Sequence, residues 1–251
     1  MSSWSRLLIT TYCSLITGHF VQEIHNLPTN TLRLGAALFN GDHGRLADEV
    51  ARLDAAGLDF IHLDVFDGHF VPDLGFPPRT IAALRPLTKL PFEVHLGALD
   101  PLRFVPHLVA AGADLIVFHV ESVTMLYESI FAIREQGVQV GLAFALGTPL
   151  TRLEPVISVL DAVLFLSRVT GEGSHGASFN PLVLPRLRAA RTMADAVGKP
   201  FDIQVAGGVK CEHVPDLVKA GVTSLALGGG LYKVADMAQE MTEIRRVAGG
   251  V

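Results

Sequence analysis

From residue 32 onward the chain repeats one pattern about every 25–30 residues: a short apolar run, a turn, and a segment with helical spacing of apolar residues. The apolar runs are nearly continuous, which is typical of strands that a parallel sheet buries on both faces. Such runs occupy residues 32–39, 58–66, 91–97, 114–122, 138–146, 162–169, 201–208 and 223–230.

A predicted helix follows each run, and four of these helices end at a glycine, as expected where a left-handed residue closes the last turn. The predicted helices occupy residues 46–53, 77–87, 101–112, 124–137, 148–160, 181–198, 211–221 and 231–247. Eight strand–helix units in about 220 residues predict an α/β fold of the (β/α)8 TIM-barrel type, with an open doubly wound sheet as the alternative. No linker-like stretch divides residues 31–251, so we expect a single barrel domain there.

The first thirty residues do not follow this pattern. Residues 7–20 are mildly apolar but are interrupted by several polar side chains, and they are too short and too polar to span a bilayer. They lack the features of a convincing signal peptide. We predict that residues 1–30 form an N-terminal extension, either an extra helix packed on the domain or a disordered segment.

The composition fits a well-buried globular enzyme, because hydrophobic residues make up 49% of the 251 residues and charged residues only 18%. A formal net charge of −5 gives no basic surplus, which argues against a nucleic-acid partner. Cys13 and Cys211 form neither a metal-ligand spacing nor a disulfide framework. A cytoplasmic protein without a membrane partner is therefore expected.

The most informative stretch is FIHLDVFDGHFVP, residues 60–72. Side chains alternate faces along a strand, so His62 and Asp64 point to one face and the apolar residues between them to the other. The pair alone is compatible with a simple hydrogen-bonded pair at a strand end. His95 on the next strand supplies a second inward imidazole, and two histidines with a carboxylate suit Zn, Fe(II) or Mn and leave positions open for a substrate. In such a site Asp64 would both bind the divalent metal and move a proton at a carbon beside a polarised carbonyl.

Glycine-rich turns follow the last two predicted strands. In a barrel, backbone N–H groups at these turns commonly bind phosphate, so Gly207, Gly208, Gly228 and Gly229 are predicted phosphate-binding residues. The loop TGEGSHGASF, residues 170–179, is long enough to close over a ligand. Its candidate lid residues are Gly171, Glu172, Gly173, His175 and Gly176.

Other polar residues near the strand ends are assigned lesser roles. We expect Asp67 to hold the turn after the second strand. His119 and Glu121, on one face of the fourth strand, are expected to serve as hydrogen-bonding groups around the site or in the core. Arg168 is compatible with either an anion contact or a surface salt bridge.

Taken together, these motifs resemble the ribulose-phosphate 3-epimerase family. The resemblance runs from about Leu34 to Tyr232 and includes IHLDVFDGHFVPDLGF, FEVHLGALDP, FHVES and IQVAGGV…LALGGGLY. It implies a ribulose-phosphate-binding TIM barrel of pentose phosphate metabolism that uses a divalent metal and two opposed aspartates to epimerise a ketopentose phosphate at C3. Matched by motif, His62, Asp64 and His95 correspond to metal ligands, and Asp64 also to one acid/base. Members of this family commonly associate, so a homo-oligomer is implied.

Four departures from the family pattern affect the expected chemistry. Ala206 stands where the family has its second acid/base aspartate, which is also a metal ligand. Ala37 stands where the family has a serine near the metal, and Phe66 replaces the methionine usual in the motif of the second strand. The family's PGFGGQ loop is replaced by the longer TGEGSHGAS.

Three functions remain open at this point. The first is a metal-dependent carbohydrate-phosphate epimerase that acts on a phosphorylated ketose through an enediolate. The second is an isomerase or lyase of a sugar phosphate that needs only one base, since Ala206 removes the other. The third is a sugar-phosphate-binding relative without catalysis.

Overall fold

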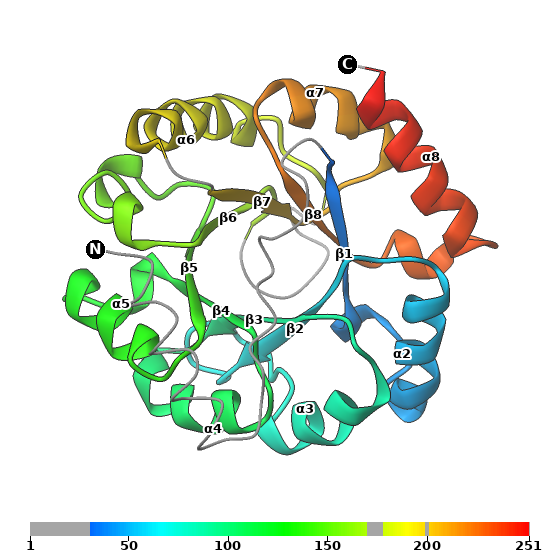
Figure 1. Ribbon diagram of the computed structural model, residues 1–251, viewed down its shortest axis with the longest axis horizontal. Coiled ribbons are helices and arrows are strands. Elements are labelled where there is room, and N and C mark those ends of the chain that lie inside the picture. Colours follow the sequence, from blue (N-terminus) through cyan, green and yellow to red (C-terminus); the bar gives the residue numbers. More distant parts are fainter. Residues whose placement is uncertain (1–30, 170–177, 199–200, 251) are drawn as a thin grey trace.

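The computed structural model describes residues 31–169, 178–198 and 201–250, and its strands close into an all-parallel barrel in which each strand pairs with the next and β8 pairs with β1 (Figure 1). The strands are β1 (Arg33–Ala37), β2 (Phe60–Phe66), β3 (Phe92–Gly97), β4 (Leu115–His119), β5 (Gln139–Phe144), β6 (Ala162–Leu166), β7 (Asp202–Ala206) and β8 (Ser224–Leu227). The predicted (β/α)8 TIM barrel is thus confirmed, and the open doubly wound sheet is excluded by the β8–β1 pairing.

The α-helices surround the barrel as an outer ring (Figure 1). They are α2 (Leu46–Ala55), α3 (Pro78–Leu84), α4 (Val105–Ala110), α5 (Leu126–Arg134), α6 (Val183–Val197), α7 (Val214–Lys219) and α8 (Met237–Gly249). Short 3-10 helices are η1 (Leu38–Asn40), η2 (His43–Arg45), η3 (Arg85–Leu87), η4 (Pro101–Arg103), η5 (Val120–Ser122), η6 (Leu150–Arg152), η7 (Ile157–Val159), η8 (Cys211–His213) and η9 (Leu231–Lys233). The predicted closing glycines Gly112, Gly137, Gly198 and Gly221 all have a positive φ.

The helix predicted over residues 148–160 is wrong. This connection between β5 and β6 contains only η6 and η7, whose bonds reach three residues back, as from the Leu153 N–H to the Leu150 carbonyl. Pro155 lies in the middle of the segment and has no N–H to donate, which prevents a continuous α-helical ladder.

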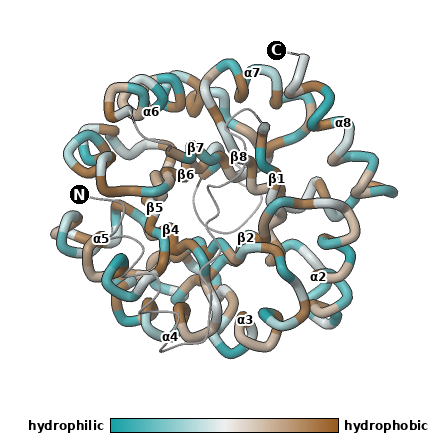
Figure 2. The backbone as a smooth tube through the Cα atoms, viewed as in Figure 1, coloured by the Kyte–Doolittle hydropathy of each residue, from teal (hydrophilic) through white to brown (hydrophobic). Residues whose placement is uncertain are grey.

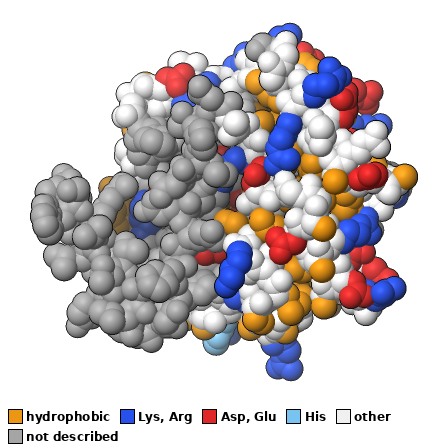
Figure 3. Space-filling model, turned by 45° about the vertical axis from the view of Figure 1, so that its right-hand side comes forward, with side chains coloured by type: hydrophobic (Ala, Val, Ile, Leu, Met, Phe, Trp, Pro, Cys, Tyr) orange, Lys and Arg blue, Asp and Glu red, His pale blue; other side chains and the backbone are white. Residues whose placement is uncertain are grey.

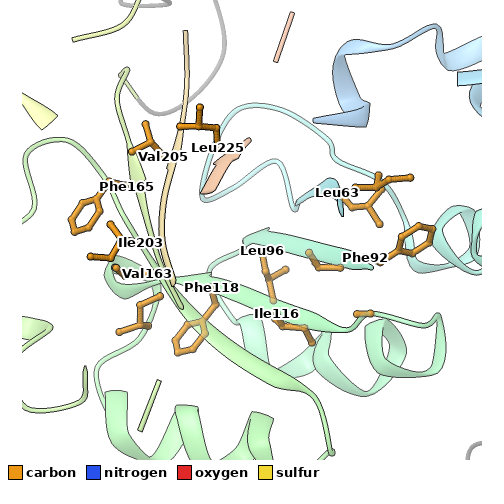
Figure 4. Close-up of a cluster of buried hydrophobic side chains, with 14 of the residues drawn as sticks. Leu63, Phe92, Leu96, Ile116, Phe118, Val163, Phe165, Ile203, Val205 and Leu225 are labelled. Carbon is orange, nitrogen blue, oxygen red and sulfur yellow. The ribbon is translucent and has the colours of Figure 1, made fainter. Parts of the chain in front are cut away.

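The main hydrophobic core lies between the barrel and the helices. Alternate residues of each strand point outward into this layer, among them Leu63, Phe92, Phe118 and Phe165, which are fully buried (Figure 4). Figure 2 shows the same distribution along the backbone, with hydrophobic residues along the strands and an alternation of polar and apolar residues on the helices. The predicted division of β2 into two faces is confirmed, because Ile61, Leu63 and Val65 belong to this core.

The interior of the barrel is divided into an apolar part and a polar part. The apolar part contains small and aliphatic side chains from β4, β5, β6, β7 and β8. Buried polar side chains from β2, β3, β4 and β7 fill the other part, including His62, Glu93, His95, His119 and Gln204. The register of β2 against β3 places His62 opposite Glu93 and Asp64 opposite His95. The pairing of β2 with β3 therefore places these imidazole and carboxylate side chains next to one another.

The outer surface carries basic and acidic side chains close to one another on the face seen in Figure 3. Among the described residues, no helix is both long enough and apolar enough to cross a membrane. The predicted extension, residues 1–30, lies outside the described residues, so the division into an extension and one barrel domain stays a prediction.

The loop after β2 folds back onto the strand that precedes it. The Phe76 N–H donates to the Asp64 carbonyl at 2.8 Å, and the Gly75 N–H donates to the Phe66 carbonyl at 3.2 Å. A Cβ atom on Gly75 would lie 2.3 Å from the Phe66 nitrogen and 2.5 Å from the Asp64 carbonyl oxygen. Only glycine allows this close approach of the two backbones beside the strand that carries Asp64.

We expect Gly75→Ala to lower the free energy of unfolding by about 1–3 kcal/mol, because the added methyl group overlaps backbone atoms that cannot rotate away. Gly147→Ala is the matched control, since a Cβ there has no heavy atom within 4 Å, and its effect should stay within about 0.5 kcal/mol. Urea unfolding of both variants checks this. Equal midpoints for the two variants would contradict the close-approach role of Gly75.

Candidate active site

A cavity of about 370 Å³ lies at the C-terminal ends of the strands, where the chemistry of such barrels is expected. The predicted site residues His62, Asp64, His95, Gly207, Gly208, Gly228 and Gly229 all line it. Ala37, Phe66 and Ala206, the positions that depart from the family pattern, line it too. The predicted lid residues Gly171, Glu172, Gly173, His175 and Gly176 lie outside the described residues.

Three of these side chains converge on one point of the cavity. His62, Asp64 and His95 each present one ligand atom, and the three atoms lie within 4.8 Å of one another. The Asp64 Oδ1 atom is 2.9 Å from His95 Nδ1 and 3.5 Å from His62 Nε2. The two strands thus bring together the two imidazoles and the carboxylate that the sequence pattern pointed to.

The other ring nitrogen of each imidazole has a hydrogen-bonding partner on the side away from Asp64. His62 Nδ1 lies 2.7 Å from Glu93 Oε1, and His95 Nε2 lies 2.9 Å from His119 Nε2. Gln204 donates to Glu93 Oε2 at 2.6 Å and to Asp202 at 2.7 Å, which continues the polar network into the barrel. Each ring is consequently fixed on one side and open toward Asp64 on the other.

The electrostatics differentiate the two histidines. Burial would lower the pKa of His62, but the Asp64 and Glu93 carboxylates beside it together raise this pKa to about 10. Burial lowers the pKa of His95 to about 4, with a further contribution from His119, against the effect of its hydrogen bond with Asp64. Burial would raise the pKa of Asp64, but His62 and His95 hold it well below its ordinary value. At neutral pH the cluster without metal therefore has a charged His62, a neutral His95 and an ionised Asp64.

This donor set fits a divalent metal ion. Two imidazole nitrogens and one carboxylate oxygen are ligands that Zn, Fe(II) and Mn share, and three protein ligands leave coordination positions open. With Ala206 in the cavity wall, β7 adds no carboxylate to the set. The ligand residues would therefore be His62, Asp64 and His95, from β2 and β3.

The glycine turns form another part of the cavity wall. Gly207 has a φ of +106° and Gly208 a φ of +69°, and the aliphatic part of Arg168 passes so close to Gly207 that a Cβ there would lie 2.5 Å from Arg168 Cγ. The Ser167 hydroxyl donates to the Ala206 carbonyl at 2.9 Å and to the Gly207 carbonyl at 2.5 Å. These contacts fix the backbone of the turn that borders the cavity, and they place a guanidinium-bearing side chain next to it.

Several polar residues singled out in the sequence lie beside the site and serve other purposes. The Asp67 carboxylate accepts hydrogen bonds from the N–H groups of His69, Phe70 and Leu99, as expected of a residue that holds the turn. His119 and Glu121 hydrogen-bond to each other at 2.9 Å, in agreement with their predicted hydrogen-bonding role.

Two carboxylates near the site escaped the sequence analysis. Glu93 alternates with His95 along β3 and therefore shares its inward face, so the reasoning used for His62 and Asp64 could have identified it. Asp73, on the loop after β2, lines the cavity and accepts a hydrogen bond from the Leu74 N–H. No strand periodicity extends into that loop, and its contribution to the cavity wall becomes visible only in the folded chain.

The charge state of the cluster predicts how metal binding depends on pH. A cation must displace the proton of His62, whose pKa of about 10 lies above neutral pH, so affinity should rise by up to about tenfold per pH unit between pH 6.5 and 9. Calorimetric titration of the metal-free protein with Zn²⁺ in buffers of different ionisation enthalpy should show release of about one proton from the site at pH 7. Release of no proton would contradict a charged His62.

Comparison with known proteins identifies the family of this chain. The model of the ribulose-phosphate 3 epimerase family matches residues 33–232. The chain is 36% identical over 215 residues to the ribulose-phosphate 3-epimerase of Bacillus subtilis (strain 168), covering 85% of this chain and 98% of that protein. It is 37% identical over 211 residues to the enzyme of the same name from a Synechocystis species, covering 83% and 91%. A solved structure of 3-hexulose-6-phosphate synthase, 21% identical with a TM-score of 0.61 over 86% of this chain and 99% of that one, shares the fold. The chain belongs to the ribulose-phosphate 3-epimerase family.

Proposed function

We propose that the protein is a metal-dependent epimerase of the ribulose-phosphate 3-epimerase type, which acts on a phosphorylated ketose through an enediolate. One observation carries the proposal: the ionised Asp64 carboxylate lies between two imidazoles in the cavity of a chain that belongs to this family. His62, Asp64 and His95 would hold a divalent metal, which we infer to be Zn, Fe(II) or Mn, and which would supply positive charge next to the oxygen beside the reacting carbon.

Asp64 is suited to take a proton from the substrate. The C3–H of a 2-ketose lies next to the carbonyl, so its acidity rises when positive charge polarises that carbonyl. Asp64 is ionised at neutral pH and faces the cavity, and its Oδ1 atom lies 2.9 Å from His95 Nδ1, so that a cation held by both residues would keep it in place. We therefore assign to Asp64 both metal binding and the first proton transfer.

The glycine turns are suited to hold the phosphate group of the substrate. Gly207 and Gly208 follow β7, and Gly228 and Gly229 follow β8, so that backbone N–H groups of both turns are available beside one cavity. Backbone N–H groups at these two positions of a barrel bind phosphate in many enzymes. The distance across the cavity between this wall and the metal cluster would set the orientation of the sugar chain.

The second candidate function, one-base chemistry on a sugar phosphate, is favoured by Ala206. Inversion at a carbon requires a proton removed from one face and another delivered to the opposite face, and an alanine methyl group transfers no proton. Among the described residues that line the cavity, Asp73 is the carboxylate besides Asp64. Glu172 and His175, on the replaced loop, are further candidates outside the described residues.

We further propose that the small-molecule partner of this protein is its sugar-phosphate substrate. We also propose that the protein forms a homo-oligomer, as the family suggests. The net charge of −5, and the acidic and basic side chains that lie close together on the face seen in Figure 3, argue against a nucleic-acid partner. Light scattering of the purified protein tests the oligomeric state.

The role of position 206 predicts the effect of restoring a carboxylate. Epimerisation of ribulose 5-phosphate by the natural protein should be slow, and Ala206→Asp should raise the rate about 10²-fold, the lower range of general acid–base catalysis. A coupled assay of xylulose 5-phosphate formation, at equal metal content, measures both proteins.

Ala37→Ser is the matched control, because it restores another cavity residue of the family without adding an acid, and we expect it to change the rate less than threefold. Asp64→Asn should abolish the reaction in either background. A rate for Ala206→Asp no higher than that of the natural protein, with metal bound, would contradict the role assigned to position 206.

A further inference from the structure

His95 is the inner member of a hydrogen-bonded series that leads from the metal cluster to the barrel wall. Asp64 Oδ1 lies 2.9 Å from His95 Nδ1, His95 Nε2 lies 2.9 Å from His119 Nε2, and His119 Nδ1 lies 2.9 Å from Glu121 Oε2. His95 and His119 are 4% and 1% exposed. Both ring nitrogens of each histidine therefore have a hydrogen-bonding partner within the protein.

Counting protons along this series leaves a single arrangement once a cation is bound. A metal at His95 Nδ1 requires a bare nitrogen there, so the proton of the neutral ring is on Nε2 and is donated to His119 Nε2. His119 Nε2 must then accept, which places the proton of His119 on Nδ1, where it is donated to Glu121. A Glu121 carboxylate that only accepts thus determines which nitrogen of His95 is free for the metal.

The outer end of the series is itself held in place. Glu121 Oε1 accepts hydrogen bonds from the Ala145 N–H at 2.9 Å and from the Thr148 hydroxyl. Burial would raise the pKa of Glu121, but these donors and His119 lower it to about 2, so this group stays an acceptor over the working pH range. Two aromatic rings pack against the imidazoles. The ring centroids of Phe66 and His95 are 5.7 Å apart, and those of Phe70 and His119 are 4.7 Å apart.

We propose that His119 and Glu121 are positioning residues of the metal centre, which act through His95 by fixing its tautomer and ring orientation. His62 receives the same support from Glu93 directly, with one hydrogen bond in place of two. The two ligands thus present different nitrogens, Nε2 of His62 and Nδ1 of His95, to one side of Asp64. Supporting groups of this kind typically change metal affinity by about 10–100-fold when removed. The inference rests on the proposed metal centre.

His119 also lines the cavity, so a direct role as a metal ligand is the competing explanation. The ring geometry argues against it. Nε2 is used by His95 and Nδ1 by Glu121, and the set of described ligand atoms that lie within 4.8 Å of one another contains His62, Asp64 and His95 without His119.

The test is a Zn²⁺ titration of the metal-free protein against a competing chelator, with no substrate present. We expect His119→Leu, which removes the acceptor for His95, to weaken Zn²⁺ binding by about 10–100-fold. His119→Gln can place its carbonyl oxygen near the lost Nε2, and it should recover most of this affinity. Glu121→Gln should weaken binding by about tenfold, since an amide can donate to His119 and release its tautomer. Glu128→Gln, on the exposed side of α5, is the matched control and should leave affinity unchanged.

A tautomer measurement and a folding measurement separate positioning from a structural role. In ¹⁵N-histidine spectra of the Zn²⁺ protein, His95 should carry its proton on Nε2 and His119 on Nδ1. The urea midpoint of metal-free His119→Gln should lie close to that of the natural protein, because the amide keeps a polar group beside His95 in this polar part of the barrel interior.

The inference is overturned if His119→Leu binds Zn²⁺ within twofold of the natural protein, or if Gln and Leu at position 119 have equal effects. Loss of binding in both variants would instead indicate that His119 is a direct ligand. His62→Ala separates failure of the positioning role from failure of the metal centre: if this variant retains Zn²⁺ affinity, the proposed metal centre itself is absent.

Discussion

The register between β2 and β3 is the constraint on which the site depends. By pairing His62 with Glu93 and Asp64 with His95, it sets a carboxylate opposite an imidazole twice in succession. A slip of one residue would turn these four side chains outward, toward the helices. The apolar residues of the other face would then point into the barrel. The large apolar residues between them, such as Leu63 and Val94, are buried in the core outside the barrel and oppose such a slip.

Charge balance follows from the same register. Burying an isolated carboxylate is costly, and a buried charge is tolerated when it is paired and hydrogen-bonded. Here Asp64 has two imidazole neighbours, Glu93 has His62 and the Gln204 amide, and Asp202 has an ion pair with Arg33 deeper in the barrel. A cation would replace the proton of His62 in this balance, so the interior accommodates a metal without gaining an uncompensated charge.

How far the sequence predicted this structure depends on the kind of pattern each part carries. The barrel was predictable because eight apolar runs alternate regularly with helical segments. The convergence of His62, Asp64 and His95 was predictable because alternation along β2 and β3 fixes which side chains point inward. The α-helix predicted between β5 and β6 does not form, because Pro155 interrupts a segment whose apolar residues still have helical spacing. Glu93 was predictable in principle, whereas the contributions of Asp73 to the cavity wall and of Arg168 to the Gly207 turn depend on loop conformations that no periodicity encodes.

Two departures from the family pattern, Phe66 on β2 and Ala206 on β7, line the cavity and differ in kind. At Phe66 the change is one of packing: the ring fills the space next to Gly97, where a Cβ would lie 2.8 Å from Phe66 Cδ1, and its plane is nearly perpendicular to that of the His95 ring. At Ala206 the change is chemical, because a methyl group stands where the family has a carboxylate. In the proposed epimerase the residues that would bind the metal are therefore kept, and the second proton transfer is the step that would differ.

The most direct test of metal-dependent proton transfer led by Asp64 is proton NMR of the metal-supplemented protein with ribulose 5-phosphate in D2O. The expected result is deuterium at C3 together with xylulose 5-phosphate, both lost when the metal is removed. Deuterium at C3 without inverted product would limit the chemistry to one base. No exchange at C3 with metal bound would contradict proton abstraction by Asp64 and, with it, the proposed function.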